Sequence, residues 1–214
     1  MGKNITELVF IVDRSGSMCG LEEDTIGGFN SVLQRNREEE GEAIVSTVLF
    51  NQESEVVHDR VGIDEVSLLT RRDYQPGGST ALLDAVCGSI RHIDRVQRYM
   101  PQDHKADHVI FVIITDGEEN ASRRWRYADA KRMIEQHRDE GWEFIFLGAN
   151  IDVAAESARL GIPDANVSRY VSDAAGTQVA YAAMADAVGS VRRSGVLRSD
   201  WNRAAEADAA ARGR

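Results

Sequence analysis

The sequence has few cysteines and no long apolar run. Its two cysteines, Cys19 and Cys87, have no metal-ligand spacing, so we expect both to stay reduced, as in a cytosol. Residues 1–7 lack the basic and apolar regions of a signal peptide, and no apolar run is long enough to span a membrane. These absences predict a cytoplasmic protein.

Positive charge is scarce as well. The 25 lysines and arginines are outnumbered by 35 aspartates and glutamates, which gives a formal net charge of −10. An acidic surface repels phosphate backbones, which argues against non-specific nucleic-acid binding as the main role. The segment 16–20 also lacks the Gly-Lys-Ser/Thr ending of a phosphate loop, so we exclude nucleotide binding of that type.

Strand-like and helix-like segments alternate along the chain of 214 residues. Apolar, β-branched runs at 7–13 and 108–115 are typical of strands buried on both faces, whereas 80–98 has apolar residues at helical spacing. The alternation predicts a Rossmann-like three-layer α/β/α fold with a mostly parallel, six-stranded sheet. A tight turn after residue 50 implies a hairpin, with 54–60 as an antiparallel edge strand.

The same patterns place the remaining elements. We expect strands at 43–50, 142–148 and 167–171, and helices at 21–37, 127–140, 152–160 and 179–191. Asp24 or Thr25 is a candidate cap for the first helix, because a short side-chain oxygen can accept hydrogen bonds from its free amides. We expect one domain at 1–192, followed by a polar, Ala- and Arg-rich tail at 193–214 that is partly helical or disordered.

The first predicted strand ends in a polar turn, Asp13-Arg14-Ser15-Gly16-Ser17-Met18. Open α/β sheets bind ligands at the carboxyl ends of their strands, where this turn is expected. Asp13, Ser15 and Ser17 offer only hard oxygen atoms. Such a set suits a hard cation such as Mg²⁺ or Mn²⁺.

Two later loops have a related character. Tyr74-Gln75-Pro76-Gly77-Gly78-Ser79-Thr80 contains a tight turn and ends near a helix start, which leaves the hydroxyl of Thr80 free to point at a ligand. The most apolar run of the chain ends in Thr115-Asp116-Gly117. Because neighbouring parallel strands end side by side, we expect Asp13 and Asp116 to flank one crevice.

Together the three loops resemble those of von Willebrand factor type A (vWA) domains. Asp13 to Ser17 resembles the D-x-S-x-S motif of that family, Gly78-Ser79-Thr80-Ala81-Leu82 its glycine-preceded threonine, and Thr115-Asp116-Gly117 the aspartate after its central strand. The resemblance covers roughly residues 5–192. Gly16 and Met18 are often seen in intracellular bacterial members, so the chain resembles a bacterial or phage-type member.

The resemblance implies a metal-ion-dependent adhesion site (MIDAS). Mg²⁺ is the implied ion, with Mn²⁺ or Ca²⁺ as alternatives, and its open position would accept a partner carboxylate. The implied function is therefore a protein-binding module without a reaction of its own, with an ATPase-type assembly among the possible partners. The implied metal residues, which act directly or through water, are Asp13, Ser15, Ser17, Thr80 and Asp116.

Other polar residues are expected at the rim of this site. Ser79 stands where many family members run Gly-Gly-Thr directly, so it could share or take the role of Thr80. Glu118 and Glu119 are interpreted as solvated loop charges, with selection of the partner carboxylate as the alternative. Arg123 and its neighbours are either ordinary surface charge or a basic rim that attracts an acidic partner segment.

The alternative function is a metal-dependent phosphoester hydrolase, in which the ion activates water. That chemistry needs a general base beside the ion. Glu118 is the only nearby carboxylate that could serve, and no histidine lies in the three loops. The sequence therefore favours binding over catalysis.

Overall fold

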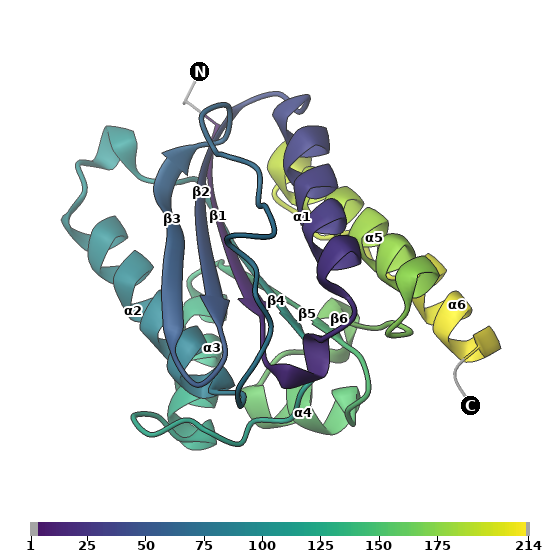
Figure 1. Ribbon diagram of the computed structural model, residues 1–214. Helices are drawn as coiled ribbons and strands as arrows, with labels where there is room; N and C mark the ends of the chain where they lie inside the picture. Colours follow the sequence, from purple (N-terminus) through teal and green to yellow (C-terminus); the bar gives the residue numbers. More distant parts are fainter. Residues whose placement is uncertain (1–3, 213–214) are drawn as a thin grey trace.

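Six strands form one mixed sheet in the order β3-β2-β1-β4-β5-β6 (Figure 1). The computed structural model describes residues 4–212. The strands are β1 (Ile5–Asp13), β2 (Glu42–Phe50), β3 (Ser54–Gly62), β4 (His108–Thr115), β5 (Glu143–Gly148) and β6 (Val167–Arg169). Neighbouring strands are parallel except β2 and β3, which form the antiparallel hairpin. The predicted fold class, a mostly parallel sheet with one antiparallel edge strand, is confirmed.

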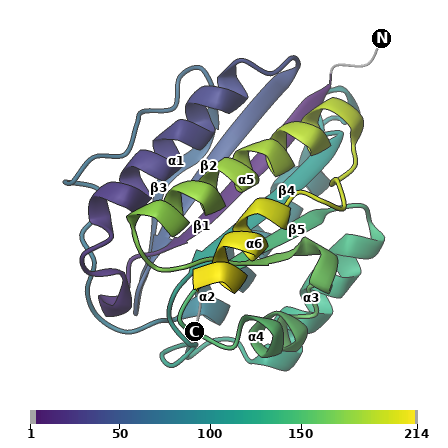
Figure 2. The ribbon, with the colours of Figure 1, turned by 90° about the vertical axis from the view of Figure 1, so that its right-hand side faces the viewer.

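Helices cover both faces of the sheet (Figures 1 and 2). One layer contains α1 (Glu22–Arg37), α5 (Ala174–Ser194) and α6 (Arg203–Arg212), and the other contains α2 (Leu82–Tyr99), α3 (Tyr127–Asp139) and α4 (Val153–Leu160). Three short 3₁₀ turns complete the elements, at Gly16–Met18, Gln102–His104 and Asp164–Asn166. No helix within 4–212 combines the length and the apolar character that a membrane span requires.

Strand β1 lies at the centre of two apolar cores because its side chains alternate between the faces of the sheet. Phe10 packs on the side of α1, where its ring meets that of Phe29 edge to face at 5.1 Å. Val9 and Ile11 point to the other side, in the cluster that contains the apolar stripe of α2. All nine residues of β1 are buried, which explains the uninterrupted apolar run at 8–12.

Several element boundaries differ from the predicted ones. Helix α1 begins after Leu21, which has no side-chain cap, so the expected capping by Asp24 or Thr25 is wrong. Thr25 is buried, and Asp24 lies in the first helical turn, where a negative charge complements the helix dipole. Helix α5 begins at Ala174, earlier than predicted, because the carboxylate of Asp173 accepts a 2.8 Å hydrogen bond from the Gly176 amide.

The C-terminal part of the chain packs on the outer edge of β6. Trp201 is buried and its indole N–H donates to the Ala165 carbonyl at 2.8 Å. On α6, the carboxylate of Glu206 accepts a 2.6 Å hydrogen bond from the backbone amide of Arg169 in β6. Helix α5 itself continues to Ser194. The division of the chain at residue 192 into a domain and a tail stays a prediction.

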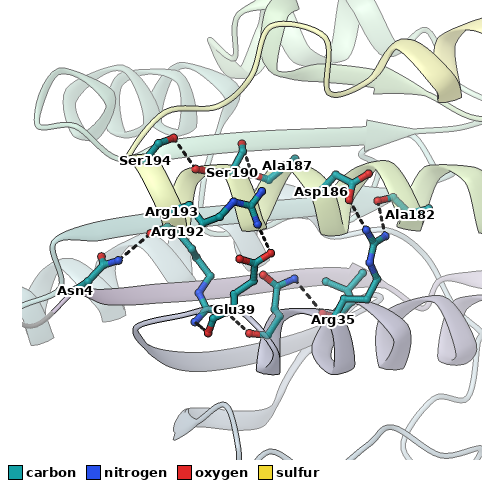
Figure 3. Close-up of polar contacts among 12 residues, drawn as sticks. Asn4, Arg35, Glu39, Ala182, Asp186, Ala187, Ser190, Arg192, Arg193 and Ser194 are labelled. Atoms are coloured by element: carbon teal, nitrogen blue, oxygen red, sulfur yellow. Dashed lines mark hydrogen bonds and ion pairs between the residues drawn. The ribbon is translucent and has the colours of Figure 1, made fainter.

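A buried arginine joins α5 to the C-terminal end of α1 (Figure 3). The guanidinium of Arg192 donates to the carbonyl oxygens of Asn36, of Glu39 at 3.4 Å and of Gly41 at 3.0 Å. The last carbonyls of a helix have no partner within it, and a cation there also complements the helix dipole. Arg192 is therefore a clamp that fixes α5 against α1.

Candidate metal site

The carboxylate of Asp13 is fixed at the end of β1. Its Oδ1 accepts a 2.6 Å hydrogen bond from the amide of Ser15, and its Oδ2 accepts one of 2.6 Å from the Thr115 hydroxyl at the end of β4. Burial raises the pKa of Asp13, the hydrogen bonds from Thr115 and Ser15 oppose that shift, and the nearby charge of Asp116 adds to it. The two strand ends expected to flank one crevice are thus joined directly.

Three hydroxyl groups converge on one point beside Gly117. A Cβ atom placed on Gly117 would lie 2.8 Å from Oγ1 of Thr80, 3.1 Å from Oγ of Ser17 and 3.3 Å from Oγ of Ser15. The hydroxyl oxygens of Ser15 and Ser17 are 3.0 Å apart. Because glycine has no side chain, the space between these hydroxyls stays open.

Asp116 completes the group. Both of its carboxylate oxygens are buried, and neither accepts a hydrogen bond from any residue within 4–212. Burial raises the pKa of Asp116, and the polar side chains of Ser17, Ser172 and Asn150 lie close enough to oppose the shift in part. A buried carboxylate without a partner costs free energy, and a cation beside it would remove that cost.

The donor set fits a hard divalent cation. It consists of two carboxylates and three hydroxyls from the ends of β1 and β4 and from the loop before α2. Mg²⁺, Mn²⁺ and Ca²⁺ prefer such oxygen ligands. The residues that the structure describes contain no group of three or more His, Cys, Asp or Glu side chains able to hold a metal, so this hydroxyl-rich set is distinct from a carboxylate- or histidine-based centre.

Comparison with known proteins rests on structure. Neither protein-family models nor curated protein sequences match the chain. Among solved structures, the vWF domain of the type V pilus tip protein Mfa5 from Porphyromonas gingivalis has a TM-score of 0.66 at 11% identity, covering 92% of this chain and 99% of that one. The von Willebrand factor type A protein from Catenulispora acidiphila has a TM-score of 0.60 at 16% identity, covering 87% of this chain and 42% of that one. The fold is that of a vWA domain.

A third solved structure with the vWA fold contains a metal. Proximal thread matrix protein 1 of the mussel byssus, described with a zinc-occupied MIDAS motif, has a TM-score of 0.55 at 16% identity over 87% of this chain. The chain spans less than half of that protein, 46%, and 42% of the Catenulispora protein. At these identities the likeness extends to the fold, and the residues of this chain carry the argument about its site.

Glycines hold the first and second loops of this vWA fold together. The amide of Gly16 donates to the Gly78 carbonyl at 3.0 Å, and the amide of Gly77 donates to the Arg14 carbonyl at 2.9 Å. Gly78 has a φ of +81°, a conformation that favours glycine. The Pro-Gly-Gly turn therefore brings the Thr80 loop against the Asp13 loop.

The third loop is tied to the second by two residues whose role the sequence did not reveal. Asn120 accepts a 2.9 Å hydrogen bond from the Thr80 amide through its side chain, and its own amide donates to the Thr80 carbonyl at 3.0 Å. Glu119 accepts a 2.9 Å hydrogen bond from the Leu83 amide in the first turn of α2. The interpretation of Glu119 as a solvated charge is therefore wrong, because its carboxylate serves as the cap that Ala81 cannot supply.

The predicted rim residues lie at different places. Ser79 is exposed, and its amide donates to the side chain of Gln52 at 3.2 Å, while Thr80 is the residue whose hydroxyl reaches the open point. Glu118 is exposed beside the Asp116 loop. The amide of Arg123 donates to Asp84 at 3.0 Å, which holds Arg123 beside α2. Their part in binding stays a prediction.

Proposed function

We propose that the protein is a metal-dependent protein-binding module. In this proposal Asp13, Ser15, Ser17, Thr80 and Asp116 hold a divalent cation, which receives a carboxylate of a partner protein. The observation that carries the proposal is the pair of buried, unpartnered oxygens of Asp116, next to the point where three hydroxyls converge. A buried negative charge without a counter-charge destabilises the folded protein, so we expect a cation to bind beside Asp116.

A cation bound here would supply an electrophilic open position for a carboxylate. The protein side chains prepare that position. Asp13 is held by its two hydrogen bonds, and the hydroxyl ligands are neutral. Because only Asp13 and Asp116 bring negative charge, the ion keeps its attraction for a third carboxylate.

Mg²⁺ is the ion that we propose, with Mn²⁺ or Ca²⁺ as alternatives. The all-oxygen donor set supports this choice, because thiol and imidazole ligands are absent from the five residues. The zinc in the MIDAS motif of the mussel protein is a property of that protein and does not decide which ion this chain binds. Repeating the thermal-unfolding experiment below with Mn²⁺, Ca²⁺ and Zn²⁺ in place of Mg²⁺ ranks the ions for this chain.

The hydrolase alternative finds no support in the geometry. A general base must lie within hydrogen-bond reach of the water that it activates. Glu118, the carboxylate nominated for that role, is exposed, and no hydrogen bond within 4–212 fixes it at the site. Its neighbour Glu119 accepts hydrogen bonds from the amides of Leu83, Ala121 and Ser122, which hold it at the start of α2. We therefore propose a binding protein rather than an enzyme.

The cellular setting is part of the proposal. The two cysteines are free, Cys19 exposed and Cys87 buried, which supports a reducing compartment such as the cytoplasm. We also propose that residues 1–192 form the vWA domain with an intact MIDAS, of bacterial or phage type, and that the partner offers an Asp or Glu and belongs to an ATPase-type assembly. Nucleic acid and membrane are not proposed as partners.

Thermal unfolding with and without metal tests the site. Mg²⁺ should raise the melting temperature of the wild type, because a ligand that binds only the folded state stabilises it. Asp13→Ala should remain folded and lose the rise. Asp103→Ala is the matched control, since Asp103 is exposed in the 3₁₀ turn after α2 and should keep the full rise. An equal response of wild type and Asp13→Ala would refute the site.

A pull-down from a cell extract tests the function. A protein partner should be retained with Mg²⁺ and released by a chelator. The Asp13→Ala variant should retain none of it. Retention that is independent of both metal and Asp13 would refute metal-dependent binding.

A further inference from the structure

A long groove runs beside the candidate metal site, on the face of the molecule that carries α2. Its volume is about 1190 Å³, larger than the roughly 300–1,000 Å³ of sites that enclose small ligands. Ser79 and Asn120 line the groove at the end near the metal loops. The groove is therefore continuous with the rim of the candidate metal site.

Four arginines line this groove: Arg91 and Arg95 from α2, and Arg123 and Arg124 from the loop before α3. All four are exposed, and none forms an ion pair with another residue of the described chain. Arg91 lies over the ring of Trp125, with its guanidinium carbon 5.4 Å from the ring centroid. We call the groove that these four arginines line the arginine groove.

The acidic residues of the arginine groove are mostly engaged already. Asp84 accepts hydrogen bonds from the backbone amides of Arg123, Arg124 and Trp125, at 3.0, 3.0 and 3.1 Å. Asp59 pairs with His92 at 2.8 Å. The lining therefore has four arginines against three acidic side chains, Glu53, Asp59 and Asp84, which is a small excess of positive charge on a chain whose net charge is −10.

The walls of the groove also present apolar surface. Val56 in the edge strand β3 is 58% exposed and lines the groove. Trp125 is half-buried against the core on the other side. An extended peptide that alternates acidic and apolar side chains would find partners for both.

We propose that the arginine groove binds an acidic, extended segment of the partner protein, the same segment that delivers a carboxylate to the metal. This inference rests on the proposed function only for the contact between the partner carboxylate and the metal. The arginines supply the first contact independently of any metal. A peptide fits better than a nucleic acid because the groove also presents Glu53 and apolar surface, which phosphate backbones would avoid.

Fluorescence anisotropy with a labelled decaglutamate peptide tests the proposal on the full chain. Binding at low ionic strength should weaken about tenfold or more in Arg95→Glu/Arg124→Glu, since two attractive contacts become repulsive. The matched control is Arg132→Glu/Arg203→Glu, which makes the same charge change at exposed positions outside the groove and should bind within about twofold of the wild type. Circular dichroism checks that all variants fold alike.

Three results would overturn the proposal: no binding of decaglutamate to the wild type, equal weakening by both double variants, or tighter binding of a short single-stranded DNA through the same arginines. Adding Mg²⁺ and the Asp13→Ala variant separates the two proposals. Binding that depends on the arginines but not on Asp13 would support the groove and argue against the metal-dependent function. Binding that depends on Asp13 but not on the arginines would do the reverse.

Discussion

The hydroxyl of Tyr74 donates a 2.6 Å hydrogen bond to the backbone carbonyl of Asp13. Tyr74 is 1% exposed, so this bond is shielded from water, and burial raises the pKa of the phenol well above its usual range. The bond links the loop that leads to Thr80 with the end of β1. The position of Asp13 therefore depends on a residue that does not itself approach the open point.

Tyr74→Phe should destabilise the protein by about 1–3 kcal/mol, because it leaves a buried carbonyl without its partner. It should also weaken the stabilisation by Mg²⁺, since Asp13 becomes less firmly held. Urea denaturation with and without Mg²⁺ measures both effects. Tyr99→Phe is the control: Tyr99 is 78% exposed, and its loss of a hydroxyl should change neither quantity.

Asp116→Asn should have opposite effects with and without metal. In metal-free buffer it removes a buried charge that has no partner and that repels Asp13. The variant should then be more stable than the wild type by about 1 kcal/mol or more. With Mg²⁺ the wild type should gain stability and the variant should not. A variant that is less stable than the wild type in metal-free buffer would contradict this account of Asp116.

Gly117→Ala should block the site while leaving the fold intact. The new methyl group would lie 2.8 Å from Oγ1 of Thr80 and would displace the hydroxyls from their common point. We expect the increase in melting temperature with Mg²⁺ to disappear. Gly27→Ala is the matched control, because Gly27 is an exposed helical residue with open space around it. The control should keep the metal response and gain up to about 1 kcal/mol from its better helix propensity.

Arg192→Met should destabilise the protein by about 2 kcal/mol or more. It leaves the buried carbonyl oxygen of Asn36 without the guanidinium, at a cost of about 1–3 kcal/mol, and it removes the partly buried bonds to Glu39 and Gly41 as well. Guanidinium chloride denaturation measures the loss. Arg193→Met, at an exposed neighbour whose ion pair is with Glu39, should cost less than about 1 kcal/mol. Similar losses in the two variants would show that Arg192 is not a clamp.

The stability of the protein should fall in mild acid because of His58. This histidine is buried between the hydroxyls of Thr47 and Ser67, each 3.0 Å from a ring nitrogen. Burial lowers the pKa of His58, while Asp73 and Ser67 oppose the shift. As the pH falls, the unfolded chain therefore binds this proton at a higher pH than the folded chain does. The contribution of His58 to the free energy of unfolding is fully present above about pH 6.5 and is lost as the pH falls below that value.

Unfolding experiments from pH 7.5 down to pH 5 test this prediction. His58→Gln should show a flatter profile than the wild type, by up to about 1.4 kcal/mol per pH unit, the limit for one proton. His104→Gln, at an exposed position, should follow the wild-type profile. Identical profiles for all three proteins would exclude His58 as the source.

The fold could be predicted wherever a single pattern in the sequence determines the type and the pairing of an element. β1 and β4 contain uninterrupted apolar runs, at 8–12 and 109–114, because both of their faces are covered, and their polar ends fall at the same edge of the sheet. Alternation of strands and helices then predicts the parallel order, and the short turn after Phe50 predicts the one antiparallel strand. These are local signals that the fold reinforces.

The supports of the candidate site were not predictable, because they depend on contacts between residues far apart in sequence. Glu119 caps α2 from 36 positions away, and Asp84 binds backbone amides of a loop about 40 positions later. Their residue types equally suit an exposed loop or a helix surface. The start of α1 was predicted to within one residue, but its capping residue was not: Thr25 faces the core inside the helix, so its hydroxyl is not available at the helix end.

The two edges of the sheet differ in a way that limits how copies of this chain can associate. Glu206 accepts a hydrogen bond from the backbone amide of Arg169, and Asn202 donates one to the carbonyl of Val167, so these two groups of β6 are not available to another strand. β3 has no neighbouring strand on its outer side within the described sheet. Strand pairing between copies can therefore occur once, β3 to β3, and ends at a dimer. A chain shortened before Trp201 would expose both edges and could grow into open-ended polymers.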